Sequence, residues 1–76
     1  MKRTPKSQLR DVIARNLRLQ RAERGWSQER LALESGLNRT YLSAVERSEQ
    51  NISIDNIARL ATALNIEAWM LVKASS

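Results

Sequence analysis

The chain has 76 residues, enough for one small domain, and carries 13 Lys and Arg against 8 Asp and Glu, a net charge of +5. It contains no Cys and no His, which excludes disulfides, thiolate zinc sites, a cysteine nucleophile and acid–base chemistry through imidazole. No apolar run approaches the about 20 residues of a membrane span, and the basic N-terminus leads into charged sequence, so we expect a cytoplasmic protein without membrane contact.

The positive charge is concentrated at the N-terminus. Residues 1–24 hold eight basic and two acidic side chains, net +6, whereas residues 25–76 are net −1. Such a surface attracts polyanions such as nucleic acid or acidic membrane, and a solvated Arg-rich helix face is the alternative. We expect residues 1–8 to form a basic tail or helix start, in which Lys2, Arg3 and Lys6 either lie near a polyanion backbone or have no specific site.

Apolar residues recur at helical spacing along almost the whole chain, and two Gly and one Pro leave little for hairpins. An all-α fold is therefore predicted. The first helix begins near Thr4-Pro5 or Ser7 and ends at Gly25, a good helix terminus. Its apolar face carries Leu9, Val12, Ile13 and Leu17.

Three further helices are predicted to begin in the same way. A Ser or Asn precedes each of "QERLALES", "RTYLSAVER" and "IDNIARLATALN", where its side chain caps the helix. The apolar residue before each cap has the spacing of a hydrophobic staple, in the pairs Trp26–Leu31, Leu37–Leu42 and Ile52–Ile57. A last short helix, "EAWMLVK", completes a compact bundle of five helices over residues 9–72, with a short tail at 73–76.

The second and third helices are separated only by Ser35-Gly36-Leu37. A turn this short, with glycine at a positive φ, makes two short helices cross steeply, which is the geometry of a helix-turn-helix. The predicted contacts at the crossing are Leu31, Ala32, Leu42 and Val45. The first turn of the third helix then presents "RTY" at an exposed end, a surface suited to a partner.

These stretches resemble the lambda-repressor-like, Cro-type (XRE) helix-turn-helix transcription regulators over about residues 9–71. The resemblance is carried by "NLRLQRAERGWSQERLALESGL", "NRTYLSAVERS" and "NISIDNIARLATALNI". Within the family, "RTYLSAVER" followed by "NISIDNI" is most similar to the controller proteins of restriction-modification systems. The chain departs from the family pattern at Ser48, where Gly is frequent, and at Ile52, where Pro is frequent.

The resemblance implies a sequence-specific, double-stranded DNA-binding regulator, associated with the nucleoid, whose third helix enters the major groove. We predict base reading by Arg39, Thr40, Tyr41 and Ala44. Phosphate contacts are predicted for Gln28, Asn38, Ser43, Arg47, Gln50 and Asn51. Capping is the simpler role for Asn38, and Tyr41 is also suited to hold a phosphate. A merely solvated helix surface is the alternative for the whole set.

Two further roles concern the scaffold. The resemblance implies an ion pair between Arg21 on the first helix and Glu46 at the end of the third. The C-terminal region has more apolar surface than a small core needs, which predicts a homodimer interface. Its predicted residues are Ile66, Trp69, Met70 and Val72. The alternative is that Trp69 or Met70 closes the core of the monomer. A dimer would favour a near-palindromic operator.

Other functions remain open at this point. A DNA-binding antitoxin of a toxin–antitoxin pair would use the same DNA surface. An enzyme is not expected, because no paired acids or nucleophile–base arrangement appear, and neither is a cofactor, a metal ion or a small-molecule ligand. Glu29 and Glu34 on the second helix either contact RNA polymerase or belong to a solvated face.

Overall fold

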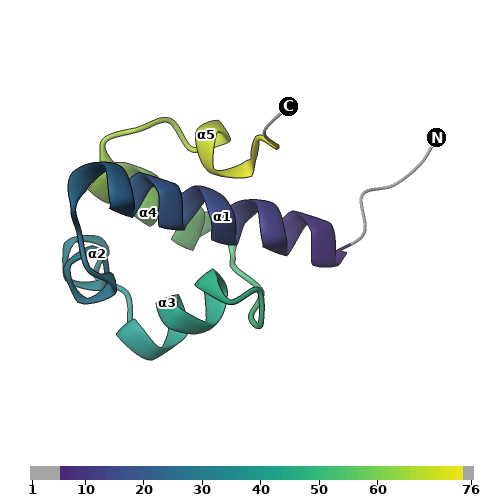
Figure 1. The fold of residues 1–76 in the computed structure, drawn as a ribbon, viewed down its shortest axis with the longest axis horizontal. Coiled ribbons are helices and arrows are strands. Elements are labelled where there is room, and N and C mark those ends of the chain that lie inside the picture. Colours follow the sequence, from purple (N-terminus) through teal and green to yellow (C-terminus); the bar gives the residue numbers. More distant parts are fainter. Residues whose placement is uncertain (1–5, 75–76) are drawn as a thin grey trace.

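The computed structural model describes residues 6–74, which form five helices around one core (Figure 1). α1 spans Lys6–Arg24, α2 Gln28–Ser35, α3 Arg39–Glu46, α4 Ile54–Leu64 and α5 Trp69–Val72. Residues 6–74 contain no strand, so the prediction of an all-α bundle is confirmed. None of these helices is long and apolar enough to cross a bilayer. The predicted roles of Lys2, Arg3 and the Lys6 side chain fall outside what the structure describes.

Side-chain caps begin α2, α3 and α4, as the sequence predicts. The side-chain oxygens accept backbone N–H groups in the pairs Ser27–Arg30 at 3.0 Å, Asn38–Tyr41 at 3.1 Å and Ser53–Asn56 at 3.1 Å. The staple residues Trp26, Leu37, Ile52 and Ile57 are half-buried against the core. These local interactions satisfy N–H groups that a helix start otherwise leaves without a partner.

The last helix is shorter than predicted. We expected a helix over residues 67–73, but α5 is a single turn, Trp69–Val72. Asn65 ends α4 in the left-handed region with φ of 57°, and the chain then needs Ile66 to Ala68 to turn back. Ala68 at the N-cap has no side-chain oxygen with which to begin the helix earlier.

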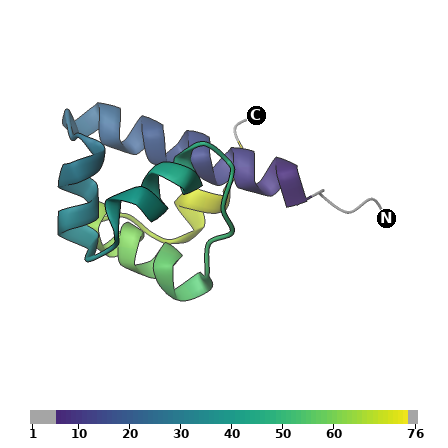
Figure 2. The same ribbon diagram turned by 90° about the horizontal axis from the view of Figure 1, so that it is seen from below.

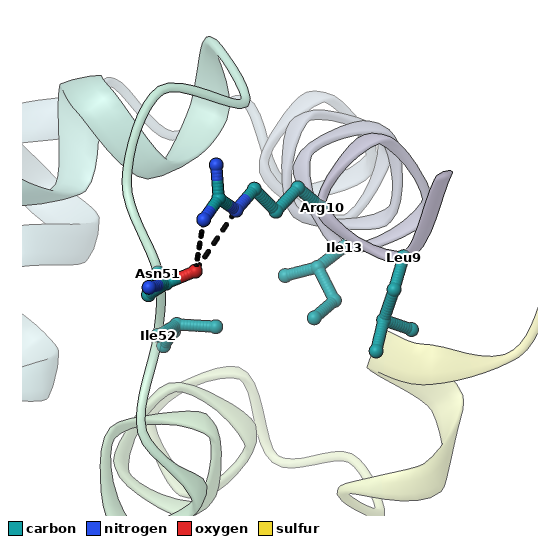
Figure 3. A pocket seen from close by; sticks show the side chains of 5 residues that line it. All are labelled: Leu9, Arg10, Ile13, Asn51 and Ile52. Carbon is teal, nitrogen blue, oxygen red and sulfur yellow. Dashed lines mark hydrogen bonds between the residues drawn. The ribbon is translucent and has the colours of Figure 1, made fainter. Parts of the chain in front are cut away.

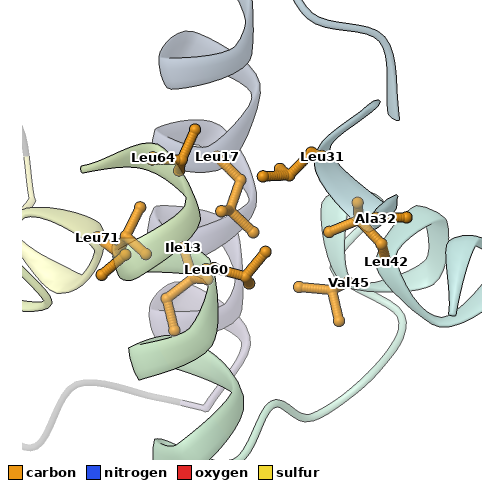
Figure 4. Close-up of a cluster of buried hydrophobic side chains, with 10 residues drawn as sticks. Ile13, Leu17, Leu31, Ala32, Leu42, Val45, Leu60, Leu64 and Leu71 are labelled. Atoms are coloured by element: carbon orange, nitrogen blue, oxygen red, sulfur yellow. The ribbon is translucent and has the colours of Figure 1, made fainter. Parts of the chain in front are cut away.

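The core lies between α1, which runs along the length of the molecule, and the other four helices (Figures 1 and 2). Each helix contributes at least one fully buried leucine or valine to it (Figure 4). The fully buried large side chains are Leu17, Leu31, Leu42, Leu60, Leu64 and Leu71. Burying a side chain of this size stabilises the fold by about 1.5–3 kcal/mol, so the core holds α3 firmly against α1.

Arginines on α1 tie the C-terminal ends of other helices to it. The Nη1 of Arg18 donates to the backbone oxygen of Glu46 at the end of α3, at 2.5 Å. The Nη2 of Arg24 donates to the backbone oxygen of Leu64 at the end of α4, at 2.5 Å. Cations are favoured at helix C-termini, where carbonyl groups lack intrahelical partners. Arg18 and Arg24, which belong to the basic N-terminal region, are therefore engaged in hydrogen bonds within the protein.

Candidate nucleic-acid interface

The turn between α2 and α3 is short and closed by glycine. Gly36 has a φ of 73°, in the left-handed region, and the Leu37 N–H donates to the Ala32 oxygen at 3.1 Å. The four predicted crossing residues are all buried: Leu31, Ala32, Leu42 and Val45. The predicted helix-turn-helix is thus present, with α3 crossing α2 over a small apolar contact (Figure 2).

Arg21 and Glu46 form an ion pair that joins α1 to the end of α3. The Nε and Nη2 of Arg21 donate to the two carboxylate oxygens of Glu46, each at 2.7 Å. Glu46 is 2% exposed, and its Oε1 also accepts from the Gln28 Nε2 at 3.0 Å. The hydrogen bonds to Glu46 and its charge raise the pKa of Arg21, against the effect of burial. Three helices therefore meet at one satisfied carboxylate.

This network changes the position expected for Gln28. We predicted a phosphate contact for it, and the structure shows that one N–H of its amide donates to Glu46. The amide group has a second N–H, which stays suited to a phosphate oxygen. The backbone N–H groups at the start of α2 are also suited to an anion.

The solvent-facing side of α3 carries the predicted base-reading residues. Arg39 and Thr40 are exposed, and Ala44 is half-buried one turn later. The Nε of Arg39 lies 3.8 Å from Glu29 Oε1, with both side chains largely exposed. An exposed pair of this kind contributes about 0–1 kcal/mol, so the Arg39 guanidinium can leave Glu29 for another acceptor at little cost.

Tyr41 differs from its neighbours because its hydroxyl is already bonded within the protein. The hydroxyl donates to the backbone oxygen of Asn51 at 3.2 Å and accepts from the Asn56 Nδ2 at 3.2 Å. Tyr41 therefore links α3 to the α3–α4 loop, residues 47–53, and to α4. We predicted base reading or phosphate binding through this hydroxyl, and either would require it to exchange these partners.

Four of the other predicted phosphate residues lie in the second half of α3 and in the α3–α4 loop, and Asn38 precedes α3. Ser43 accepts from Arg47 Nη1 at 2.5 Å, and Arg47 Nε donates to Glu49 at 3.0 Å. The Gln50 side-chain oxygen accepts the Asn51 N–H at 3.2 Å. The predicted residue Asn38 serves as the α3 cap. Arg47, Gln50 and Asn51 are exposed.

The backbone conformation at Ser48 explains why the family frequently has Gly at this position. Its φ is 63°, a left-handed conformation in which a side chain is disfavoured. The backbone turns back after α3 here, since the Ser48 N–H donates to Val45 at 3.0 Å and the Glu49 N–H to Ala44 at 2.9 Å. Glycine adopts this conformation without strain, so Ser48 adopts the same turn at a higher conformational cost.

Sequence reasoning missed Arg10, to which it assigned no individual role. The Nε of Arg10 donates to the Asn51 Oδ1 at 2.9 Å, and its Nη2 donates to the same oxygen (Figure 3). The two residues are 41 positions apart. Basic character on α1 was the sole sequence signal, and it does not indicate which acceptor a guanidinium will reach.

The four predicted interface residues around α5 differ in their solvent exposure. Trp69 is 56% and Val72 40% exposed, and Met70 is half-buried. Leu71 is fully buried and is the α5 side chain that closes the monomer core. The fourth predicted residue, Ile66, is half-buried against the core. Exposed apolar side chains therefore remain on α5, the feature from which a dimer was predicted.

Comparison with known proteins gives a consistent family. A helix-turn-helix family model, HTH_3, matches residues 17–68. The chain is 53% identical over 64 residues to a hypothetical transcription factor of Neisseria meningitidis, covering 84% of this chain and 60% of that relative's length. The restriction-modification controller protein C.AhdI from Aeromonas hydrophila has a similar structure, with a TM-score of 0.79, 47% identity, and coverage of 82% of this chain and 94% of that one.

A further similar structure contains DNA. The controller protein C.Esp1396I, as a tetramer in complex with its natural 35 base-pair operator, has a TM-score of 0.76 and 30% identity, covering 83% of each chain. The matched segment of the family model includes α2, the turn and α3 in full. On sequence and structure together, the chain belongs to the HTH_3 helix-turn-helix family.

Proposed function

We propose that the protein is a sequence-specific, double-stranded DNA-binding regulator of transcription, of the controller-protein type. The observation that carries the proposal is the exposed first turn of α3, with Arg39 and Thr40 at the surface while Leu42 and Val45 anchor the helix in the core. The solved C.Esp1396I complex with its operator supports the choice of DNA as the partner. The matched relatives are transcription regulators and controller proteins rather than enzymes.

In this proposal α3 lies in the major groove and its exposed residues meet base edges. The groove is about 12 Å wide, which admits a helix. Arg39 is suited to the O6 and N7 of guanine, a bidentate contact that contributes about 1–3 kcal/mol of discrimination. Thr40 offers a hydroxyl or a methyl group, and the small Ala44 leaves room for a thymine methyl. Tyr41 lies beside them, and its ring would contact a base while its hydroxyl keeps its bond to the loop.

The flanks of α3 would contact the phosphate backbone. On one side lies the N-terminus of α2 at Gln28, whose backbone N–H groups and helix dipole favour an anion. On the other side lie the exposed residues of the α3–α4 loop. The proposed loop and helix contacts are Asn38, Ser43, Arg47, Gln50 and Asn51. Contacts of this kind fix register and orientation, and base contacts add the specificity.

We also propose that the protein acts as a homodimer through the α5 patch, which comprises Ile66, Trp69, Met70 and Val72. The exposure of Trp69 and Val72 supports this assignment, because exposed apolar patches mark interaction surfaces. Two α3 helices about 34–36 Å apart would read successive major-groove turns, and the operator would be a near-palindrome. Bound to DNA, the protein would be associated with the nucleoid in the cytoplasm.

A contact with RNA polymerase is proposed for the outer face of α2. Glu29 and Glu34 lie on this face, and Leu33 between them is 78% exposed. Glu34 is paired with Arg30 at 3.0 Å, but both side chains are about half-exposed, so the pair is readily exchanged. An exposed leucine flanked by carboxylates is suited to a partner with a basic, partly apolar surface.

The experiment that tests the function is selection of bound duplexes from a randomised DNA library at two salt concentrations. We expect recovery of an inverted repeat whose half-sites are about one helical turn apart. Arg39→Ala should relax the selection at one base pair of each half-site, whereas Arg59→Ala on the exposed face of α4 removes the same charge and should leave the motif unchanged. Binding that depends steeply on salt but recovers no motif would contradict sequence reading.

A further inference from the structure

We propose that Arg10 on α1 is a positioning residue for DNA binding, because it holds the α3–α4 loop in the conformation that presents Asn51 to a phosphate. The inference rests on the proposed function and adds a residue from outside the helix-turn-helix unit. Arg10 acts in it through Asn51 and does not itself need to touch DNA. The bonds to Asn51, the orientation that they impose, the open pocket beside the loop and the left-handed residue at its start support this role.

Asn51 is held from two helices. Arg10 on α1 donates to its side-chain oxygen through both Nε and Nη2 (Figure 3). Tyr41 on α3 donates to its backbone oxygen at 3.2 Å. Hydrogen bonds from a charged donor are about twice as strong as those between neutral groups. The loop is therefore tied at one residue to the helix proposed to read DNA and to the helix that supports it.

The bonds to Arg10 also fix the orientation of the Asn51 side-chain amide. Because Oδ1 of Asn51 faces Arg10, the Nδ2 group of the same amide faces the opposite way. Within residues 6–74, no hydrogen bond from this Nδ2 to a protein group is present, and the side chain is exposed. An amide N–H donor is the group that an Asn offers to a phosphate oxygen. The bonds to Arg10 thus leave the donor directed outward.

Close packing does not replace these bonds. An open pocket of about 280 Å³ lies beside the loop and is lined by Leu9, Arg10, Ile13, Asn51 and Ile52 (Figure 3). Ile52 packs against the core, but Asn51 faces this open space and is not surrounded by close-packed apolar side chains. The guanidinium of Arg10 reaches from α1 to the loop at this pocket.

The α3–α4 loop has little else to hold its conformation near Asn51. It begins at Ser48 with a φ of 63°, and Glu49, Gln50 and Asn51 are exposed. Segments with few buried contacts open locally at low free energy. If the competent conformation is populated only in part, the apparent affinity falls by that fraction. The bonds from Arg10 raise the fraction of molecules that are ready to bind.

The test is a double-mutant cycle on binding to the duplex recovered by the selection. Arg10→Ala should weaken binding to this duplex by about tenfold, which corresponds to about 1.4 kcal/mol. The variant with both Arg10→Ala and Asn51→Ala should bind no more weakly than Asn51→Ala alone, since Arg10 acts through Asn51. Arg59→Ala is the control for the loss of one positive charge from an exposed helix face.

Two further variants separate positioning from direct phosphate contact. Arg10→Lys keeps the charge but has a single ammonium in place of the planar fork, so we expect most of the loss to persist. Arg10→Gln keeps an apolar stem at the pocket and replaces Arg10→Ala in the cycle if Arg10→Ala is poorly folded by circular dichroism. Hydrogen exchange at residues 49–51 of the free protein should speed up in Arg10→Lys and in Arg10→Gln. Loss of a phosphate contact would not produce this effect.

The outcomes are distinct. Full affinity in Arg10→Lys, with the slope of log K against log salt reduced by about 1 in Arg10→Ala, would make Arg10 a phosphate contact and overturn the inference. Additive losses in the cycle, or unchanged binding by Arg10→Ala, would overturn it as well. If the wild-type protein selects no duplex and binds all DNA alike, the proposed function itself fails.

Discussion

Replacing Glu46 by Ala should be among the most destabilising single changes to this chain. The carboxylate is 2% exposed and accepts three hydrogen bonds, two from Arg21 and one from Gln28. Removing one member of a buried ion pair costs about 3–5 kcal/mol. The lower end applies here, because the Arg21 side chain is 19% exposed and keeps its bond to the Trp26 oxygen. We therefore expect a loss of about 3 kcal/mol in the free energy of unfolding.

That loss is large against the stability of a small domain. A chain of 76 residues is expected to have a total free energy of unfolding of about 4–11 kcal/mol. In a domain of this size, each kcal/mol lost lowers the midpoint of thermal unfolding by about 4–8 °C. The midpoint should therefore fall by about 12–24 °C. The magnitude depends on the burial of one carboxylate, so an exposed carboxylate in the same region is the proper comparison.

The assay is urea unfolding followed by helical circular dichroism, on Glu46→Ala and on Glu49→Ala. Glu49 pairs with Arg47 at 3.0 Å, but both side chains are more than half exposed, and its removal should cost less than about 1 kcal/mol. An Arg21→Ala and Glu46→Ala cycle should show strong coupling. If Glu46→Ala costs no more than Glu49→Ala, the ion pair does not hold α3 to α1 and our account of the scaffold is wrong.

Three further predictions concern the loop, the reading surface and the dimer. Ser48→Gly should raise stability by about 0.5–1 kcal/mol, since it relieves a left-handed φ at the expense of some chain entropy; a lower urea midpoint would refute this. Arg39→Ala should weaken cognate binding by about 1–3 kcal/mol and spare nonspecific binding in a fluorescence titration, and equal losses on both DNAs would exclude base reading. Trp69→Gln with Val72→Gln should yield monomers in analytical ultracentrifugation, whereas an unchanged dimer would move the interface elsewhere.

The sequence by itself determined the first four helices and the helix-turn-helix, whereas α5 is shorter than predicted. Ser27, Asn38 and Ser53 cap their helices within three residues, and Gly36 needs only its own backbone freedom to close the turn. Such short-range interactions can be predicted from the sequence, because the partners are close neighbours in the chain wherever the motif occurs. The buried faces followed from the period of 3.6 residues, which assigned Leu42 and Val45 to the core.

The family resemblance implied the Arg21–Glu46 pair, but only the tertiary structure decided which other polar side chains meet. Arg10 reaches Asn51 across 41 residues, and Gln28 turns to Glu46 across 18. Periodicity places a side chain on a face of its helix but does not say which partner from another helix will lie opposite it. Leu71 rather than Trp69 closes the core for a related reason: in one turn of four apolar residues, the neighbouring helices select the side chain that faces inward.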